Sequence, residues 1–273
     1  LKADAAAGFC YDNRGLIASC SSTTDVTADD YGCYLAVFVG NNGLDVGYEK
    51  EGGTIMNCYG VGKVYAPAPP ADVISTGTHL CGFCMANYTS AGAYMVNCYY
   101  NSTIVPEIET PGRPGEYGKT TADLQSREFV DSLNFMAALM GTHLWQYNEG
   151  DYPTPTDVLA TDVAPFLGGG HGTEAAPFLV DNKQHLENVA YAANRNWEFS
   201  GQHLLQTADI ALNAPKENWG EQMPTMWTPI ACAAANTMNE WSHHFSGCYD
   251  GGLHTVQNLY VDGNAGSYAG LFG

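Results

Sequence analysis

The chain has few basic residues. Only 10 of its 273 residues are lysine or arginine, against 29 aspartates and glutamates, so its formal net charge is −19 at pH 7. Proteins that bind nucleic acids or anionic membranes need a basic surface, because lysine and arginine neutralise phosphates and release their counterions. The sequence therefore predicts no nucleic-acid partner and no attachment to an anionic membrane.

Long hydrophobic runs are also missing. No segment reaches the roughly 20 apolar residues that a membrane-spanning helix needs, so we expect no membrane insertion. No positively charged leader precedes an apolar stretch, so any secretion signal is expected to be removed or to lie outside this sequence. Charged residues make up only 14% of the chain, and uncharged polar side chains replace them, as in many extracellular β-proteins. We expect an extracellular location.

What the chain does have is a repeat. A short apolar strand ending in cysteine occurs three times, at intervals of 38 and 40 residues, with its cysteine at Cys20, Cys58 and Cys98. A second short block precedes each strand, at 7–10, 36–40 and 81–84, and recurs at 269–273. Fixed periods of this size are typical of repeat architectures. The sequence predicts an all-β fold, a right-handed parallel β-helix with short capping α-helices.

The repeated cysteines are expected to form a ladder inside this solenoid. Neighbouring rungs of a parallel β-helix lie about 4.8 Å apart, so residues at one repeat position stack on each other. Cys20, Cys58 and Cys98, together with Asn57 and Asn97, are the predicted core ladder. Buried thiols are the favoured interpretation, because parallel side chains make the disulfide dihedral angle awkward. A disulfide and a metal site remain alternatives, although no cofactor is expected.

Two helical patterns divide the chain. Thr120 to Leu124 begins a helix predicted at about 121–140, whose apolar stripe is expected to cover the exposed last rung. A second capping helix is predicted at about 182–194, with Asp181 at its cap. We therefore predict half of a β-helix over 1–156, a linker over 157–172 and the other half over 172–273. The acidic loop 25–30 is expected to be solvated, with calcium binding as the alternative.

The second half carries the phrases Gly172-Thr173 to Val180 and Phe245-Ser246-Gly247 to Leu259, followed by Gly270-Leu271-Phe272-Gly273. These phrases resemble the bacterial surface β-helix proteins that carry the GLUG motif, and the resemblance extends over nearly the whole chain. It implies an adhesin-like module on a bacterial cell surface. Cys248 replaces the usual threonine, and the two halves stand in swapped order.

The swapped order leads to a prediction about assembly. If the C-terminus is read as continuing into the N-terminus, the number of residues from Phe272 to Cys20 differs by one from the number from Phe38 to Cys58. By this count, the two ends of the chain match as parts of one rung. Uncovered rungs would leave bare strand edges. We expect a head-to-tail homo-oligomer or filament, with closure within one chain or a longer tandem array as alternatives. The predicted interface consists of Phe9, Cys10, Ile17, Cys20, Leu259, Tyr260, Leu271 and Phe272.

The main rival to a structural or adhesive module is a carbohydrate-active β-helix enzyme, a lyase or hydrolase. Such an enzyme needs paired carboxylates in one groove, or a basic residue beside acidic calcium ligands. No acidic pair recurs on adjacent rungs, and Asp250 has the context of a turn. We therefore expect no enzymatic activity and no catalytic or metal-binding residue. A non-catalytic appendage of a surface peptidase is a further alternative, and a glycan or a host surface is a further expected partner.

Overall fold

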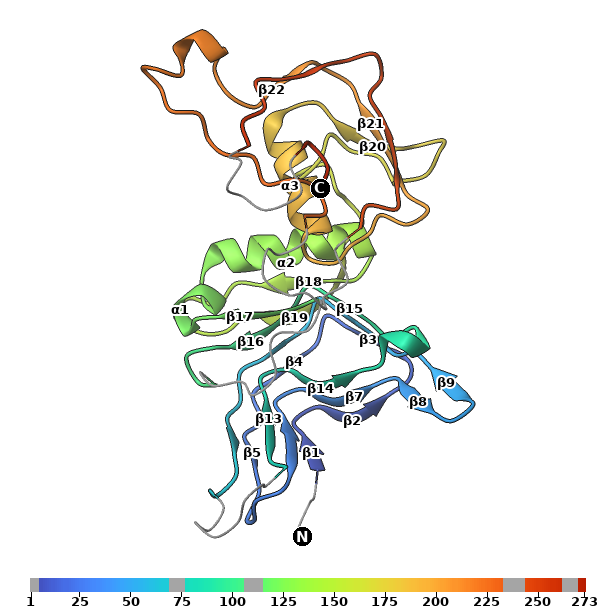
Figure 1. The fold of residues 1–273 in the computed structure, drawn as a ribbon, viewed down its shortest axis with the longest axis vertical. Helices are drawn as coiled ribbons and strands as arrows, with labels where there is room; N and C mark the ends of the chain where they lie inside the picture. Colours follow the sequence, from blue (N-terminus) through green and yellow to red (C-terminus); the bar gives the residue numbers. More distant parts are fainter. Residues whose placement is uncertain (1–4, 69–76, 106–114, 233–243, 262–269) are drawn as a thin grey trace. The chain divides into compact units, whose positions relative to one another are not determined.

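The computed structural model describes residues 5–68, 77–105, 115–232, 244–261 and 270–273. The chain divides into two compact units, Leu1–Ala160 and Thr161–Gly273, and each is described by itself. Figure 1 shows short strands stacked in the first unit and a smaller set around one helix in the second. In the parts described, no helix is long and apolar enough to span a bilayer.

The first unit is a parallel β-solenoid built from three rungs. Rung 1 contains β1 (Ala5–Ala7), β2 (Cys10–Asn13), β3 (Leu16–Ala18), β4 (Ser21–Ser22) and β5 (Val26–Thr27). Rung 2 contains β6 (Tyr34–Ala36), β7 (Val39–Asn42), β10 (Thr54–Met56), β11 (Tyr59–Gly60) and β12 (Val64–Tyr65). Rung 3 contains β13 (His79–Cys81), β14 (Cys84–Asn87), β15 (Tyr94–Val96) and β16 (Cys98–Asn101), after which β17 (Glu116–Lys119) continues the stack.

The strand register confirms the repeat seen in the sequence. Ile17 pairs with Ile55, and Ile55 pairs with Met95, in parallel strands. Cys10 pairs with Val39, which pairs with Cys84. The predicted parallel β-solenoid is therefore confirmed for this unit. The two insertions that make the repeat uneven are the antiparallel hairpin of β8 (Leu44–Val46) and β9 (Glu49–Glu51) and the segment between β12 and β13.

The core of the solenoid is a set of stacked columns. Phe9, Phe38 and Phe83 form one column, with successive ring centroids 4.6 Å apart and ring planes only 10° from parallel. Offset aromatic stacks of this kind add about 0.5–1.5 kcal/mol per pair to the stability gained from burial. Beside this column lies an apolar cluster of Val39, Ile55, Cys58, Cys84, Met95 and Cys98.

The predicted capping helix lies elsewhere than expected. It is two helices, α1 (Thr121–Leu124) and α2 (Arg127–Met140), because Ser126 begins a new cap by accepting a hydrogen bond from the amide of Phe129. Phe129 packs on Tyr59 of rung 2 and on Tyr99 of rung 3, at centroid distances of 5.9 and 5.0 Å. A helix that contacts neighbouring rungs runs along the side of the solenoid. The prediction that it covers the last rung was therefore wrong.

An antiparallel hairpin completes this side layer. It consists of β18 (His143–Gln146) and β19 (Thr154–Leu159), where the sequence predicted a single final strand. The carbonyl of His143 accepts a hydrogen bond from Ser19 Oγ at 3.2 Å, so the layer also reaches rung 1. Tyrosines of β11 and β16 thus face this layer, while their neighbours Cys58 and Cys98 face the interior.

The second unit is a shorter parallel stack. Its strands are β20 (Phe178–Val180), β21 (His203–Gln206), β22 (Ile210–Ala211), β23 (Cys248–Asp250) and β24 (Val256–Gln257). They pair in the orders β20-β21-β23 and β22-β24, with an isolated parallel bridge between Ile230 and Phe272. Helix α3 (Lys183–Ala193) follows β20, and its cap is Asn182 rather than the predicted Asp181.

Residues 157–172 have more structure than the predicted linker. Strand β19 extends to Leu159, and the side chains of Val163 and Leu167 are buried. The amide of Gly168 donates to the carbonyl of Leu179, so the glycine-rich end of the segment is bonded to β20. The apolar residues within the segment explain this order, since they pack against neighbouring structure instead of facing solvent.

Candidate functional site

The open face of rung 1 is the main candidate for a functional surface. In the described part of the chain, each of the strands β1 to β5 has a partner on one side only and forms an edge of its sheet. An edge strand presents unpaired backbone groups and therefore serves as a template for another strand. Phe9 and Leu16 on this rung are 46% and 66% exposed. We call this surface, formed by β1 to β5, the open face.

The opposite end of the same columns is closed. Phe83 in rung 3 is fully buried, although it occupies the same position as Phe9. The ring of Tyr100 contributes to this closure, because it packs against the apolar cluster and lies next to Gly82, where a Cβ atom would come within 2.6 Å of the ring. The two ends of the solenoid therefore differ. Strands β13, β14 and β15 are also edges of their sheets, but the phenylalanine of the column is buried at rung 3 and half exposed at rung 1.

The predicted interface residues of the first unit all lie on rung 1. Phe9 stacks on Phe38, while Cys10, Ile17 and Cys20 are partly buried against the apolar cluster. Rung 1 thus has a phenylalanine of its own. A Phe272 segment added to this face would stack beyond Phe9 instead of filling a gap in rung 1, so the interval counted in the sequence does not define a missing half-rung.

The predicted interface residues of the second unit lie at or beside its own edge. The carbonyl of Leu271 accepts a hydrogen bond from the amide of Ile230. The ring of Phe272 contacts the ring of Tyr249, with 5.6 Å between their centroids. Leu259 is 37% exposed, and Tyr260 packs edge-on against Trp219 at 5.4 Å. Ala269, in the same repeated block, lies outside the described residues. Strands β23 and β24 are edges of their sheets, so this unit also presents an unpaired rung.

Asparagine side chains run through the solenoid as hydrogen-bonded ladders. Asn97 Nδ2 donates to Asn57 Oδ1 at 2.8 Å, and Asn57 Nδ2 donates to the carbonyl of Leu133 in α2. Both asparagines adopt a left-handed backbone conformation, with φ of 55° at Asn57 and 52° at Asn97. Ser19 takes this position in rung 1, with φ of 50°. This corner turns each rung and anchors the side layer.

A second ladder was missed by the sequence analysis. Asn13 Nδ2 donates to Asn42 Oδ1, and Asn42 Nδ2 donates to Asn87 Oδ1, both at 2.8 Å. These asparagines stand four residues after Phe9, Phe38 and Phe83, so the phenylalanine blocks already contained the signal. Buried amides must be hydrogen-bonded to avoid a desolvation cost of about 1–3 kcal/mol each. The ladder therefore fixes the register between rungs.

The cysteines of the thiol ladder differ in burial. Cys20 is partly buried, whereas Cys58 and Cys98 are fully buried. A hydrogen bond from the Cys58 thiol lowers the pKa of Cys20 to about 7. Burial raises the pKa values of Cys58 and Cys98. The nine cysteines are all free thiols in this structure.

The described residues contain no cluster of three or more histidine, cysteine, aspartate or glutamate side chains able to hold a metal. In the acidic loop 25–30, Asp25 Oδ1 accepts the amide of Lys63 at 2.8 Å. This carboxylate therefore joins two neighbouring rungs, because Asp25 directly precedes β5, Lys63 directly precedes β12, and these two strands pair.

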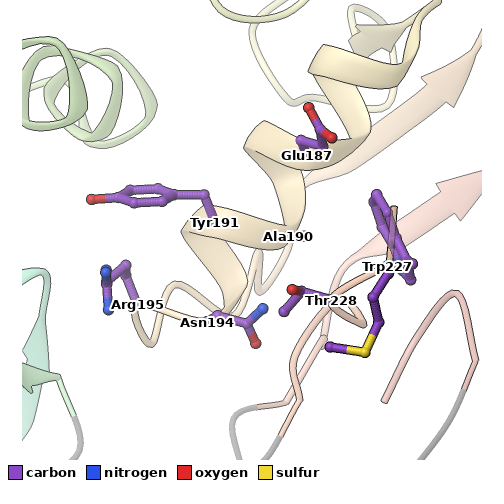
Figure 2. A pocket seen from close by; sticks show the side chains of 8 residues that line it. Glu187, Ala190, Tyr191, Asn194, Arg195, Trp227 and Thr228 are labelled. Carbon is purple, nitrogen blue, oxygen red and sulfur yellow. The ribbon is translucent and has the colours of Figure 1, made fainter. Parts of the chain in front are cut away.

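A pocket of about 300 Å³ lies in the second unit, between α3 and residues 226–228. Figure 2 shows Glu187 at one end and Arg195 at the other, with Trp227 on the wall facing α3. The guanidinium of Arg195 lies 5.1 Å from the centre of the Tyr191 ring. Asn194 connects the walls, since its Nδ2 donates to the carbonyl of Pro229. The pocket combines one carboxylate, one guanidinium and aromatic surface.

Comparisons with known proteins give one distant match. A segment of 107 residues, 39% of this chain, is 30% identical to a protein of Evansella cellulosilytica described as a "Putative Gly-rich membrane protein". The match covers only 10% of that protein. No protein-family model matches the chain, and no solved structure matches it. The likeness to that glycine-rich protein is therefore partial, and what the chain itself shows is a solenoid-like repeat of short parallel strands.

Proposed function

We propose that this protein is a structural or adhesive module, extracellular or on a bacterial cell surface, that assembles with copies of itself by stacking rungs head to tail. The observation that carries this proposal is the open face, where β1 to β5 are edge strands and where Phe9, between β1 and β2, and Leu16, on β3, are exposed. A second copy of the chain would bury these side chains and pair the free backbone groups, as β-augmentation does in peptide recognition.

The direction of the strands supports the stacking of one copy on another. Rung 1 is the first rung of its stack in chain order, whereas β23 and β24 are the last strands of theirs. A parallel solenoid continues when a last rung meets a first rung with the same strand direction. The corners also match, because Asn258 has φ of 57° and Ser19 has φ of 50°. Aligning the corners puts Val256 next to Ile17, an apolar pair like those within the solenoid.

We also propose that the solenoid is right-handed, as parallel crossovers nearly always are, and that the chain is related to the surface β-helix proteins with GLUG motifs. The module is not an enzyme, binds no nucleic acid and does not insert into a membrane. Closure within one chain, or attachment to a further rung in a longer array, would use the same open face and would leave a purified chain monomeric.

Sedimentation velocity on the purified chain tests the assembly. We expect larger species as the protein concentration rises, and we expect Leu16→Lys to keep the chain monomeric, because a lysine on the open face would have to lose its hydration. Tyr48→Lys is the matched control, since Tyr48 is fully exposed on the β8–β9 hairpin and does not belong to rung 1. A wild-type chain that stays monomeric at every concentration would refute head-to-tail assembly.

A second candidate function is glycan binding at the pocket beside α3. Its volume of about 300 Å³ is at the lower end of the range for small-molecule sites. Glu187 and Thr228 offer a carboxylate and a hydroxyl near aromatic surface, a combination that suits sugar hydroxyls and C–H faces (Figure 2). Glycoside hydrolysis usually needs two carboxylates, and the described lining contains one, so we propose binding without cleavage.

A panel of neutral and acidic oligosaccharides, titrated by calorimetry, tests this second candidate. Binding should fall at least tenfold in Glu187→Ala and persist in Lys183→Ala, which removes the exposed ion-pair partner of Glu187 outside the pocket lining. Equal loss of binding in the two variants, or no binding by the wild-type chain, would mean that this pocket is not a glycan site.

A further inference from the structure

The thiol ladder contains two neighbouring cysteines in unlike surroundings, Cys20 on rung 1 and Cys58 on rung 2. Strands β3 and β10 pair in register up to Ala18 and Met56, and the next pair, Ser21 with Tyr59, keeps the same offset. Cys20 and Cys58 therefore lie directly opposite each other. The amide of Cys20 also donates to Cys58 Sγ at 3.3 Å.

We propose that Cys20 and Cys58 form a redox-active dithiol that closes a reversible disulfide between rung 1 and rung 2. The partner of the reaction is a low-molecular-weight disulfide such as oxidised glutathione. This inference concerns chemistry within one chain and does not depend on head-to-tail assembly.

The reaction proceeds in two exchange steps. The Cys20 thiolate attacks one sulfur of the small disulfide, so a Cys20–sulfur bond forms and one small thiolate leaves. The Cys58 sulfur, after giving up its proton, then attacks the Cys20 sulfur and expels the second small thiolate. The protein dithiol loses two electrons and two protons in total, and the small disulfide is reduced to two thiols.

The two cysteines differ in the way that this order requires. Cys20 is partly buried on the open face and has its pKa lowered to about 7 by the hydrogen bond from Cys58, so it supplies thiolate near neutral pH. Cys58 is fully buried and has its pKa raised by burial, so it cannot meet an external disulfide directly. It can reach only a sulfur that is already attached to Cys20.

The geometry favours a bond that opens again. Parallel neighbouring strands lie about 4.8 Å apart, which is within the Cα–Cα range of disulfides. The two side chains leave their strands in parallel directions, however, and this opposes the preferred dihedral angle near 90°. Strained disulfides have higher reduction potentials and are more readily reduced. The ladder therefore suits a switch better than a permanent crosslink.

Two other thiols in the same fold serve as internal controls. Cys98 stacks on Cys58 in the next rung, but both are fully buried and their thiols are out of reach of an external disulfide. Cys10 is partly buried on rung 1 like Cys20, but the residue opposite it is Val39. Cys10 can therefore carry a mixed disulfide and has no thiol across the rung to resolve it.

Peptide mass spectrometry after incubation in a glutathione redox buffer tests the proposal on the full chain carrying Leu16→Lys, which keeps the open face accessible. We expect a Cys20–Cys58 crosslinked peptide that disappears when reduced glutathione is restored. Near pH 7, Cys20 should react about fivefold faster than an unperturbed thiol, after allowance for its lower nucleophilicity. In Cys58→Ala, Cys20 should instead keep a stable glutathione adduct.

The Cys20→Ser variant keeps the test valid if Cys58→Ala does not fold. It should leave Cys58 unmodified in the same buffer, because the buried thiol has lost its only route to the reagent. The proposal is overturned if Cys20 and Cys10 carry only mixed disulfides, if Cys58 crosslinks to Cys98, or if Cys58 reacts without Cys20.

Discussion

At the scale of single residues, Asn57 combines two tasks. Its left-handed backbone, with φ of 55°, turns the rung, and its side chain bonds Asn97 and the carbonyl of Leu133. Asparagine suits both tasks, because it tolerates this conformation better than other side chains do and supplies a donor and an acceptor. Ser19 holds the same corner in rung 1 and bonds the side layer through its hydroxyl.

Two substitutions of Asn57 separate these tasks. Asn57→Gly keeps the backbone conformation and loses the amide, so we expect the free energy of unfolding to fall by about 2–3 kcal/mol. Asn57→Ala loses the amide and also strains the backbone, which adds about 1 kcal/mol. Urea denaturation measures both values. Equal destabilisation by glycine and alanine would mean that the left-handed corner carries no cost for an ordinary side chain.

The buried thiols predict how stability changes with pH. Burial raises the pKa values of Cys58 and Cys98, so in the folded state they stay protonated where unfolded thiols ionise. The unfolded chain then binds fewer protons, and stability falls as pH rises above about 9, by up to ~1.4 kcal/mol per pH unit for each thiol. The contribution of Cys20 to the pH dependence of stability has the opposite sign. Its pKa is lowered in the folded state, so the stability that it contributes is lost as pH falls from 9 to 7.

Urea titrations at several alkaline pH values measure this slope. Cys98→Ala should unfold more easily at neutral pH because it leaves a cavity, yet its loss of stability per pH unit above 9 should be smaller than that of the wild-type chain. An unchanged slope in Cys98→Ala would show that these thiols do not control the alkaline response.

At the scale of secondary-structure elements, α2 is a side wall of the solenoid. Its buried residues include Phe129, Val130 and Leu133, and they pack on tyrosines that point out of β11 and β16. The helix therefore stabilises the contacts between rungs 2 and 3 as well as its own turn. This position also leaves the open face uncovered.

Leu133→Ala tests the role of this wall. Leu133 is fully buried, so its truncation should lower the free energy of unfolding by about 2–5 kcal/mol. Asp131→Ala is the control on the exposed face of the same helix and should change stability by less than about 0.5 kcal/mol. Thermal unfolding followed by circular dichroism distinguishes the two. A mild effect of Leu133→Ala would mean that the solenoid is stable without the side layer.

The sequence predicted those elements whose spacing is regular and missed those that depend on three-dimensional packing. The cysteine-ended strands recur at nearly equal intervals and could be aligned by counting, so their parallel stacking was predicted. The asparagine ladder from Asn13 to Asn87 was missed because the β8–β9 hairpin and the segment before β13 make its intervals unequal. The side position of α2 was missed because an apolar stripe shows that a helix is covered but not what covers it.

At the scale of the whole molecule, the central feature is the contrast between the two ends of one solenoid. Phe83 is buried at one end and Phe9 is exposed at the other, along a single stacked column. A solenoid end normally carries a polar cap, because an open rung invites uncontrolled pairing. In the proposed assembly, the open face has a defined partner, which is the last rung of another copy.

Hydrogen–deuterium exchange followed across a range of protein concentrations can detect this stacking, because it reports on the edge strands themselves. We expect backbone amides of β2, β3 and β24 to become protected as the concentration rises, while those of the β8–β9 hairpin do not change. We also expect Leu16→Lys to abolish this gain in protection. Exchange in β2, β3 and β24 that is independent of concentration would contradict head-to-tail stacking at the open face.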